Sequence, residues 1–274
     1  MIGIGVSYGA ISVINAIPCG IGSTIGVDLC TKVLFEPCDG PVRVEIVRGQ
    51  DHLDDTLVRT CVRRTLERIG KDPSISYRLR IESDIPPSRG LKSSSSVCNA
   101  TIGAVLDYYD VRMDAMEMIR LGVECAVECK VTITGAFDDA CGCHLGGLVV
   151  TDNAERSLIA RKELPKYDVL IFIPEKRITK DKVDVAKYRE HREEFEQLAH
   201  SVEEDPLGVM CRNGKTVAEI IGMDDSLVNE AMAAGALAAG VSGTGPAVAA
   251  IFAPGTAAEA EKRFKHNMIR CRVR

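Results

Sequence analysis

Apolar and polar residues alternate in two short segments of the first third of the chain. Val42–Val47 alternates like a half-buried strand, and Tyr77–Ile81 does so more weakly. The opening Met1–Ile17 is rich in Ile, Val, Ala and Gly, but polar residues interrupt it, so it lacks the run of about 20 apolar residues that a membrane span needs. The pattern predicts a buried strand pair at the start of the chain, followed by two further strands.

Helical periodicity appears between and after these strands. Apolar residues recur every three or four positions over 53–69, and Gly70 stands where a helix would end. A second helix is predicted for Val97–Asp107, after a run of serines. A third is predicted from Asp114, whose carboxylate can cap the first turn, to about Lys130.

The second half of the chain has its elements in a different order. The pattern predicts strands at Leu148–Val150 and Val169–Ile173, charged helix over 182–204 and further helix to about Gly240, a glycine-rich strand pair at Val241–Phe252, a helix at Ala257–His266 and a short final strand. This order predicts an α+β protein in two parts, an α/β half over residues 1–155 and an α+β half over residues 156–274.

Composition and charge exclude several classes of protein. The chain has 274 residues, 46% of them hydrophobic, which is enough to fill the core of one large domain or two modest ones. The formal charge of -5 offers no basic face for nucleic acid. The first residues lack the pattern of a charged segment, an apolar core and a cleavage site, so the eleven cysteines are expected to be reduced and packed as small apolar side chains. We therefore expect a cytoplasmic protein that binds neither nucleic acid nor membrane.

One segment carries the pattern of a phosphate site. Residues 86–96 read Pro-Pro-Ser-Arg-Gly-Leu-Lys-Ser-Ser-Ser-Ser. The prolines end a strand, Gly90 permits a tight turn, and small hydroxylated residues then open a helix. Free backbone N–H groups at a helix start suit a phosphate chain. The alternative is a serine-rich cap on an ordinary surface helix.

The same segment resembles motif 2 of the GHMP kinases, which has the pattern Pro-x-x-x-Gly-Leu-x-Ser-Ser. Val241–Val248 is similar to the glycine-rich motif 3 of that superfamily, and Ile14–Asp28 is a weaker match to motif 1. The resemblance implies the GHMP kinase fold, in which an α/β half like domain 2 of ribosomal protein S5 packs on a ferredoxin-like half. It also implies an ATP site formed by Pro86, Pro87, Ser88, Arg89, Gly90, Leu91, Lys92, Ser93, Ser94, Ser95 and Ser96 with Gly243 and Gly245.

A further segment indicates the acceptor. Ile133–Ala140, followed by Gly146 and Gly147, resembles the archaeal shikimate kinases of this superfamily. The resemblance implies transfer of the ATP γ-phosphate to the 3-hydroxyl of shikimate. Two alternatives stay open: another GHMP kinase acting on homoserine or a mevalonate-type alcohol, and a non-catalytic GHMP-fold binding protein.

The same resemblance implies roles for acidic residues. Counted back from Gly146, Asp139 falls where mevalonate kinase-like members have the catalytic aspartate. Glu128, eleven positions earlier, falls where they have a glutamate that holds Mg²⁺, with Ser94 as the matching hydroxyl ligand. Asp138 is the competitor for the catalytic role, and a solvated helix surface is the alternative for Glu128.

Two other patterns are set aside. Residues 208–216 imitate a Walker A loop, but they have one residue too many between their glycines, and no clear strand precedes them. Cys125, Cys129, Cys141 and Cys143 have no standard zinc spacing and are expected to be buried thiols. The residues that bind the acceptor carboxylate stay open, and so does the oligomeric state, for which a homodimer is one candidate.

Overall fold

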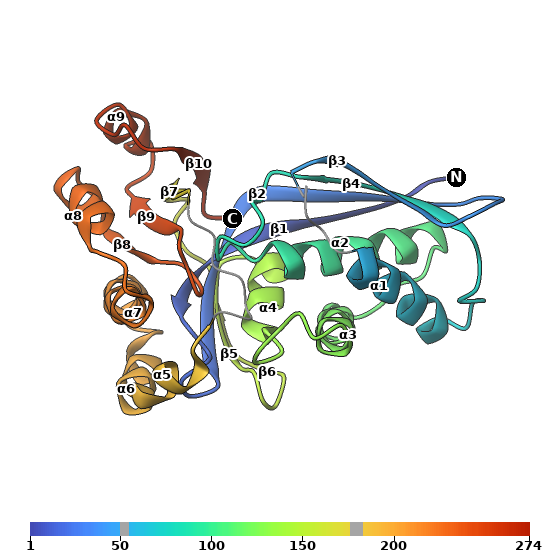
Figure 1. Cartoon of the computed structure of the whole chain (residues 1–274), viewed down its shortest axis with the longest axis horizontal. Helices are drawn as coiled ribbons and strands as arrows, with labels where there is room; N and C mark the ends of the chain where they lie inside the picture. The colour runs from blue at the N-terminus through green and yellow to red at the C-terminus, as the bar shows by residue number, and fades with distance from the viewer. Residues whose placement is uncertain (50–54, 176–182) are drawn as a thin grey trace.

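The computed structural model describes residues 1–49, 55–175 and 183–274. It contains two β-sheets lying side by side, each with its own helices, and the chain passes from one to the other between residues 162 and 168 (Figure 1).

The first sheet is built around one long strand, β2. Its strands are β1 (Gly3–Ile14), β2 (Ile21–Pro37), β3 (Arg43–Arg48), β4 (Tyr77–Ser83), β5 (Leu148–Asp152) and β6 (Ser157–Lys162). β1 pairs with β2 along most of its length. On the other edge of β2, residues 31–37 pair with β4 and residues 21–25 pair with β5. β2 therefore joins the β4 part of the sheet to the β5 part.

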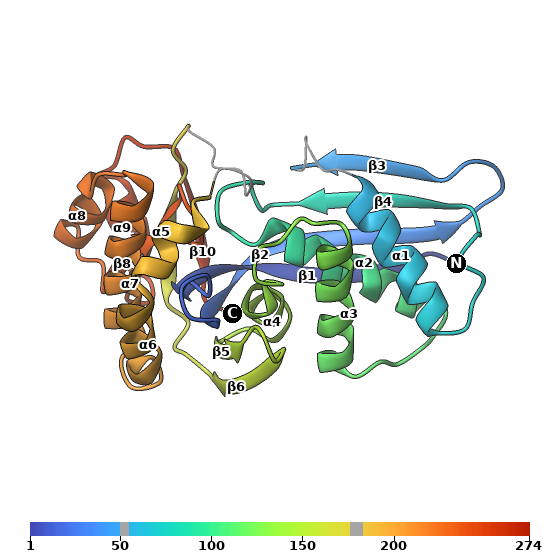
Figure 2. The ribbon, with the colours of Figure 1, turned by 60° about the horizontal axis from the view of Figure 1, so that its bottom comes forward.

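The helices of this half lie across one face of the sheet (Figure 2). They are α1 (Asp55–Arg68), α2 (Ser93–Tyr108), α3 (Ala115–Glu128) and α4 (Phe137–Leu145). α2 runs so close to β1 that a Cβ atom at Gly5 would overlap the carbonyl group of Ala100. This close packing places the first turn of α2 near the junction of the two halves.

The second half has an antiparallel sheet with the order β10-β7-β9-β8. Its elements are β7 (Asp168–Phe172), α5 (Val185–Glu190), α6 (Arg192–Ser201), α7 (Pro206–Ile221), α8 (Ser226–Ala233), β8 (Ala238–Val241), β9 (Val248–Phe252), α9 (Ala257–Glu261) and β10 (Met268–Arg272). The halves share a buried cluster, in which Ile11 and Ile25 of the first sheet join Leu170 and Ile251 of the second. Their relative position is thus fixed by apolar burial.

Most predicted elements are present. The helix ending before Gly70 and the helix capped by Asp114 both form, and Asp114 accepts hydrogen bonds from the backbone N–H groups of Met116 and Glu117. The start of the first predicted helix, at residues 53 and 54, and residue 182 of a later one lie outside the described residues.

The predicted elements need correction at several points. α4 was not predicted, and β8 occupies residues 238–241, where helix was predicted to continue to about Gly240. Met1–Ile17 forms one strand rather than a strand pair, because its partner is the following β2. β6 was missed because only its pairing with β5 makes the polar stretch after residue 152 a strand. The charged helix over 182–204 is interrupted at His191, and α9 ends at Glu261 rather than at His266.

The sheet topology also locates the boundary between the two halves of the chain. The boundary predicted after residue 155 lies in the turn between β5 and β6, which belong to the same sheet, so the change of sheet comes after Lys162. Over the described residues, no helix combines the length and apolar character needed to cross a bilayer.

Candidate active site

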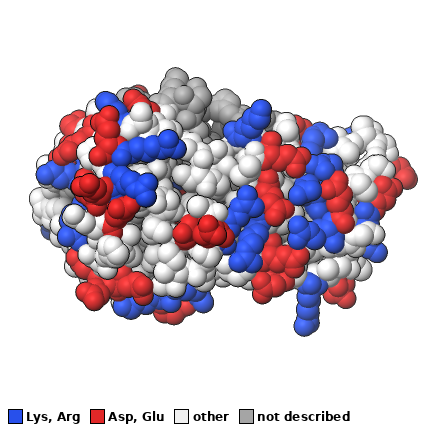
Figure 3. Space-filling view, turned by 90° about the horizontal axis from the view of Figure 1, so that it is seen from below, with Lys and Arg blue, Asp and Glu red and all other residues white. Residues whose placement is uncertain are grey.

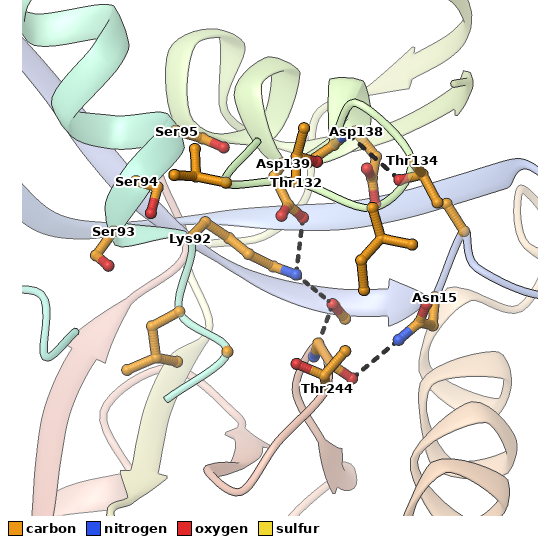
Figure 4. Close-up of a pocket in the computed structure, with 18 of the residues that line it drawn as sticks. Asn15, Lys92, Ser93, Ser94, Ser95, Thr132, Thr134, Asp138, Asp139 and Thr244 are labelled. Atoms are coloured by element: carbon orange, nitrogen blue, oxygen red, sulfur yellow. Dashed lines mark hydrogen bonds and ion pairs between the residues drawn. The ribbon is translucent and has the colours of Figure 1, made fainter. Parts of the chain in front are cut away.

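A cavity of about 440 Å³ lies where the two halves meet, and it brings together segments that are far apart in sequence. Its lining comes from the end of β1, the loop before α2, the loop between α3 and α4, the first turn of α4 and the loop between β8 and β9 (Figure 4). These segments include parts of all three motifs that resemble those of the GHMP kinases.

The first turn of α2 forms one wall of the cavity. Ser93, Ser94 and Ser95 line it, and the residue before the helix, Lys92, has a left-handed backbone with φ 66° and gives the helix no side-chain cap. The early N–H groups of a helix have no partner within the helix. This wall, called the phosphate wall below, therefore has backbone donors at the positive end of a helix dipole, an arrangement that suits a phosphate group.

The loop before α2 packs directly on the loop between β8 and β9. Gly90 has φ +79°, and a Cβ atom there would overlap the carbonyl group of Ser242. The Ser242 hydroxyl donates a hydrogen bond of 2.8 Å to the Gly90 carbonyl oxygen. Only glycine fits at residue 90 without moving one loop away from the other.

A buried ion pair lies on the floor of the cavity. Lys92 Nζ is 2.7 Å from Asp139 Oδ1, and the two side chains are only 6% and 17% exposed. Lys92 also donates a 2.7 Å hydrogen bond to the Ser12 hydroxyl oxygen, which accepts a second bond from the Gly243 N–H group. In Figure 4 the Lys92 side chain extends from the start of α2 toward Asp139. Lys92 therefore joins motif 2 to β1 and to the segment proposed to be catalytic, and through the Ser12 hydroxyl it is connected to motif 3.

The electrostatics of the floor depend on two adjacent carboxylates. Burial lowers the pKa of Lys92, but the negative charges of Asp139 and Asp138 outweigh it, so the net shift is upward and the ammonium stays charged. Burial and the charge of Asp139 raise the pKa of Asp138 to about 6. Asp138 and Asp139 thus have different environments, although they are neighbours in sequence.

Asn153, which nothing in the sequence indicated, supports the site by holding Asp138. Its Oδ1 atom accepts a hydrogen bond from the Asp138 N–H group at the start of α4, and its Nδ2 atom donates to Asp138 Oδ1 at 2.8 Å. The same Nδ2 atom contacts the Thr134 hydroxyl at 3.2 Å, so Asn153 ties the α3–α4 loop to the first turn of α4. Its sequence neighbourhood carries no signal of this role, because the contact exists only once β5 lies beside α4.

Two further residues connect the loops, and each carried a signal in the sequence. Asn15, inside the weak match to motif 1, donates from Nδ2 to the Gly243 carbonyl oxygen at 3.1 Å. Ser12 is a buried hydroxyl within an otherwise apolar strand segment. A polar residue at a core position of a strand is the kind of exception that can be noticed before a structure is known.

Most of the predicted nucleotide-site residues line the cavity. They are Pro87, Ser88, Gly90, Leu91, Lys92, Ser93, Ser94, Ser95 and Gly243, and Asp139 lines it as well. Pro86, Arg89, Ser96 and Gly245 do not. Ser96 is fully buried in α2, and Arg89 reaches away from the cavity to the carbonyl groups of Pro174 and Glu175. Arg89 thus braces the loop against the second half of the molecule.

Glu128 lies outside the cavity, contrary to the predicted pairing with Ser94 on one metal ion. It ends α3 on the surface, where its carboxylate forms ion pairs with Arg63 and Arg64 of α1. Positive and negative side chains interleave on this face of the molecule (Figure 3). The helix α3 turns this residue toward α1 rather than toward the start of α2, which eleven residues of spacing cannot reveal. The structure therefore favours the surface alternative for Glu128.

The two patterns set aside earlier also have defined positions. Residues 208–216, which imitate a Walker A loop, lie within α7. Cys125 and Cys129 belong to the end of α3, whereas Cys141 and Cys143 are buried in α4. All eleven cysteines are free thiols. In the part of the chain that the structure describes, no three His, Cys, Asp or Glu side chains cluster as metal ligands.

Comparison with protein families identifies the class. The family model described as "GHMP kinases N terminal domain" matches residues 56–147, and the one described as "GHMP kinases C terminal" matches residues 191–270. The chain belongs to the GHMP kinase family, an enzyme family that uses ATP as phosphate donor.

Similar proteins narrow the class further. The chain is 38% identical over 255 residues to a shikimate kinase of Methanothrix thermoacetophila, covering 92% of this chain and 85% of the relative. It is 36% identical over 256 residues to a shikimate kinase of Pyrococcus abyssi, covering 92% of each.

Solved structures agree on the fold. The mevalonate kinase of Methanococcus jannaschii superposes with a TM-score of 0.78 at 16% identity, covering 100% of this chain and 98% of that one. The galactokinase of Lactococcus lactis superposes with a TM-score of 0.74 at 14% identity, covering 99% and 93%. At these identities the superpositions confirm the GHMP kinase fold and nothing about the acceptor.

Proposed function

We propose that this protein is a shikimate kinase, which transfers the γ-phosphate of ATP to the 3-hydroxyl of shikimate and yields shikimate 3-phosphate. The product lies on the route to chorismate and the aromatic amino acids. Relatives bearing this name cover most of the chain at 32–38% identity. The observation that carries the mechanism is the buried pair of Lys92 and Asp139 beside the uncapped start of α2.

The nucleotide end of the site is assigned to the first turn of α2. Its backbone N–H groups and the hydroxyls of Ser93 to Ser95 face the cavity, so the phosphate chain of ATP has donors without any Walker A loop. Leu57, from the first turn of α1, supplies an apolar contact at the same cavity.

Asp139 is assigned the role at the acceptor hydroxyl. As the hydroxyl oxygen attacks the γ-phosphorus, the bond to the leaving ADP breaks, and the hydroxyl proton passes to the Asp139 carboxylate. Lys92 keeps its proton and offsets negative charge between donor and acceptor. In a loose transition state positioning contributes as much as proton removal does. Asp138 is the weaker candidate because Asn153 donates a hydrogen bond to its Oδ1 atom and the residue is only 4% exposed.

The cavity residues are compatible with magnesium carried by ATP. Mg²⁺ keeps most of its coordination from phosphates and water and takes only one or two protein oxygens. The Ser94 hydroxyl, at the phosphate wall, would be one of them. Magnesium supplies neutralisation of the phosphate charge. The predicted second ligand, Glu128, does not fit this role because it pairs with Arg63 and Arg64 on the surface.

The test is a comparison of acceptors. Purified protein is assayed for ATP consumption with shikimate, homoserine and mevalonate, and the phosphorylated position is identified by ³¹P–¹H NMR. We expect kcat/KM for shikimate to exceed the others by about 10² or more, because a site built to bond a polyhydroxy acid leaves polar groups unpaired with other alcohols.

Preference for homoserine or mevalonate would instead indicate another GHMP kinase, and no ATP consumption with any acceptor would indicate a binding protein. A cytoplasmic location, with its supply of ATP, is part of the same proposal. A homodimer remains a prediction, to be checked by light scattering.

A further inference from the structure

The far end of α4 is held by a residue outside every motif. α4 carries Asp139 in its first turn, at the cavity. At its last turn, the Arg274 guanidinium donates to the carbonyl oxygens of His144 at 2.8 Å and Cys143 at 3.2 Å. A cation at a helix C-terminus satisfies carbonyl groups that lack a partner within the helix and complements the helix dipole.

Arg274 is itself fixed by the first half of the molecule. Its guanidinium stacks over the ring of Tyr8, with 4.1 Å between the guanidinium carbon and the ring centroid. Its backbone N–H group donates to the Gly26 carbonyl oxygen at 3.0 Å, and its carbonyl oxygen accepts from the Gly147 N–H group at 2.9 Å. Burial lowers the pKa of this arginine, so desolvation of the guanidinium opposes its charged form.

The segment leading to Arg274 joins the two halves of the molecule. β10 pairs with β7 in the second sheet. At the last residue of β10, the Arg272 N–H group donates to Asp28 Oδ1 at 2.7 Å, and the next residue, Val273, forms a bridge to Val27 on β2. Figure 1 shows this end of the chain, marked C, between the second sheet and the first. A residue carried by the second half therefore holds the helix that carries Asp139.

We infer that Arg274 is a positioning residue for phosphoryl transfer, which fixes α4 along its axis so that Asp139 stays against Lys92 and within reach of the acceptor. It touches neither substrate in this assignment and acts only through α4. The inference rests on the proposed function in so far as Asp139 is the group at the acceptor hydroxyl. Misplacing a reacting group by about 1 Å can cost up to about 10² in rate.

The experiment measures single-turnover rates of Arg274→Met and Arg274→Lys. We expect Arg274→Met to lower the rate about tenfold, with the Kd for ATP within about threefold of the wild type, because the phosphate wall belongs to α2 and not to α4. Arg274→Lys should recover part of the loss, since it restores a cation at the helix end. Arg270→Met is the matched control, because Arg270 lies on β10 but pairs with Glu261 on the surface.

A double-mutant cycle separates positioning from mere stability. In an Asp139→Asn background, Arg274→Met should lower the residual rate less than twofold, because the group it positions is already gone, while the loss of thermal stability should be equal in both backgrounds. If Arg274→Met folds poorly, Tyr8→Leu weakens the same anchor and should shift the rate in the same direction.

Two results would overturn the inference: a rate within twofold of wild type in Arg274→Met, or an equal fold-loss in both backgrounds. Failure of the proposed function looks different, because wild-type protein would then be inactive with shikimate. In that case the cycle is run with whichever acceptor the wild type phosphorylates.

Discussion

The floor of the cavity and the outer face of α1 and α3 both hold acidic side chains paired with cations, but the two regions differ in burial. The Asp139 and Lys92 side chains are 17% and 6% exposed, whereas the Glu128 and Arg63 side chains are 47% and 40% exposed. An exposed pair contributes only about 0–1 kcal/mol to stability, because water and salt screen it. Removing one partner of a buried pair leaves an uncompensated charge and costs about 3–5 kcal/mol.

The resemblance to the superfamily implied a role for both acidic residues, but the structure brings only Asp139 to the cavity and leaves Glu128 on the surface. Asp139 lies at the start of a helix that points into the cavity. Glu128 lies at the end of a helix whose charged face meets α1. A carboxylate beside a buried lysine is a candidate catalytic group. A carboxylate among surface arginines is expected to contribute to solubility and, modestly, to stability.

The largest effect on the rate is expected from Asp139→Asn. We expect the single-turnover rate to fall by about 10² to 10⁴ at saturating ATP and shikimate, with ATP affinity nearly unchanged, because the positioned proton acceptor is lost. Thermal unfolding checks that the protein still folds around Lys92. Glu259→Gln is the matched control, since Glu259 is also 2.7 Å from a lysine but 69% exposed. A crippled Asp138→Asn beside a near-normal Asp139→Asn would exchange the two roles.

Gly90→Val should have the next largest effect. The backbone at residue 90 has φ +79°, which a residue with a side chain rarely adopts, and a Cβ atom there would overlap the Ser242 carbonyl group. The two loops must therefore separate. We expect ATP affinity and turnover each to fall about tenfold or more, measured by calorimetry and by steady-state assay. Unchanged ATP binding in a folded Gly90→Val variant would argue against the phosphate wall.

Asp138→Asn tests whether the two adjacent carboxylates differ in protonation and in their effect on the rate. Native Asp138 holds its proton up to about pH 6, whereas the ordinary value is 3.8. Between these values the native state binds more protons than the unfolded state, so this residue makes stability fall as the pH rises from about 4 to about 6. Relative to wild type, Asp138→Asn should therefore gain about 1–3 kcal/mol between pH 4 and pH 7.

Urea unfolding at several pH values measures this gain, and a difference that stays constant over that range would contradict it. The effect of Asp138→Asn on the rate should be below about tenfold, because its carboxylate is held by Asn153.

The smallest effect is expected from Glu128→Gln. The magnesium concentration for half-maximal rate should stay within about twofold of wild type, and stability should change by less than about 1 kcal/mol. Ser94→Ala is the informative partner, because it removes a hydroxyl at the phosphate wall and should raise the magnesium requirement. A clear rise of the magnesium requirement in Glu128→Gln would instead indicate that Glu128 is a magnesium ligand.

Local chemistry in the sequence was sufficient for most of the elements and for the conformation of the loop before α2. Asp114 marked a helix start, and Gly70 a helix end. The glycine and serines between residues 86 and 96 predicted a turn followed by uncapped helix N–H groups, because these features depend on residues adjacent in the chain. The three motifs, in order, indicated the GHMP kinase fold.

Only the tertiary structure decided which distant side chains meet. Lys92, Ser12 and Asp139 come together through three separate segments, and Asn153 and Arg274 hold opposite ends of α4 from elsewhere in the chain. Sequence distance carries no information about such contacts, because they depend on how the sheets and helices pack. The direction in which a helix turns its charged face, as at Glu128, is likewise fixed by its neighbours, so local pattern predicted the elements while packing selected the residues of the site.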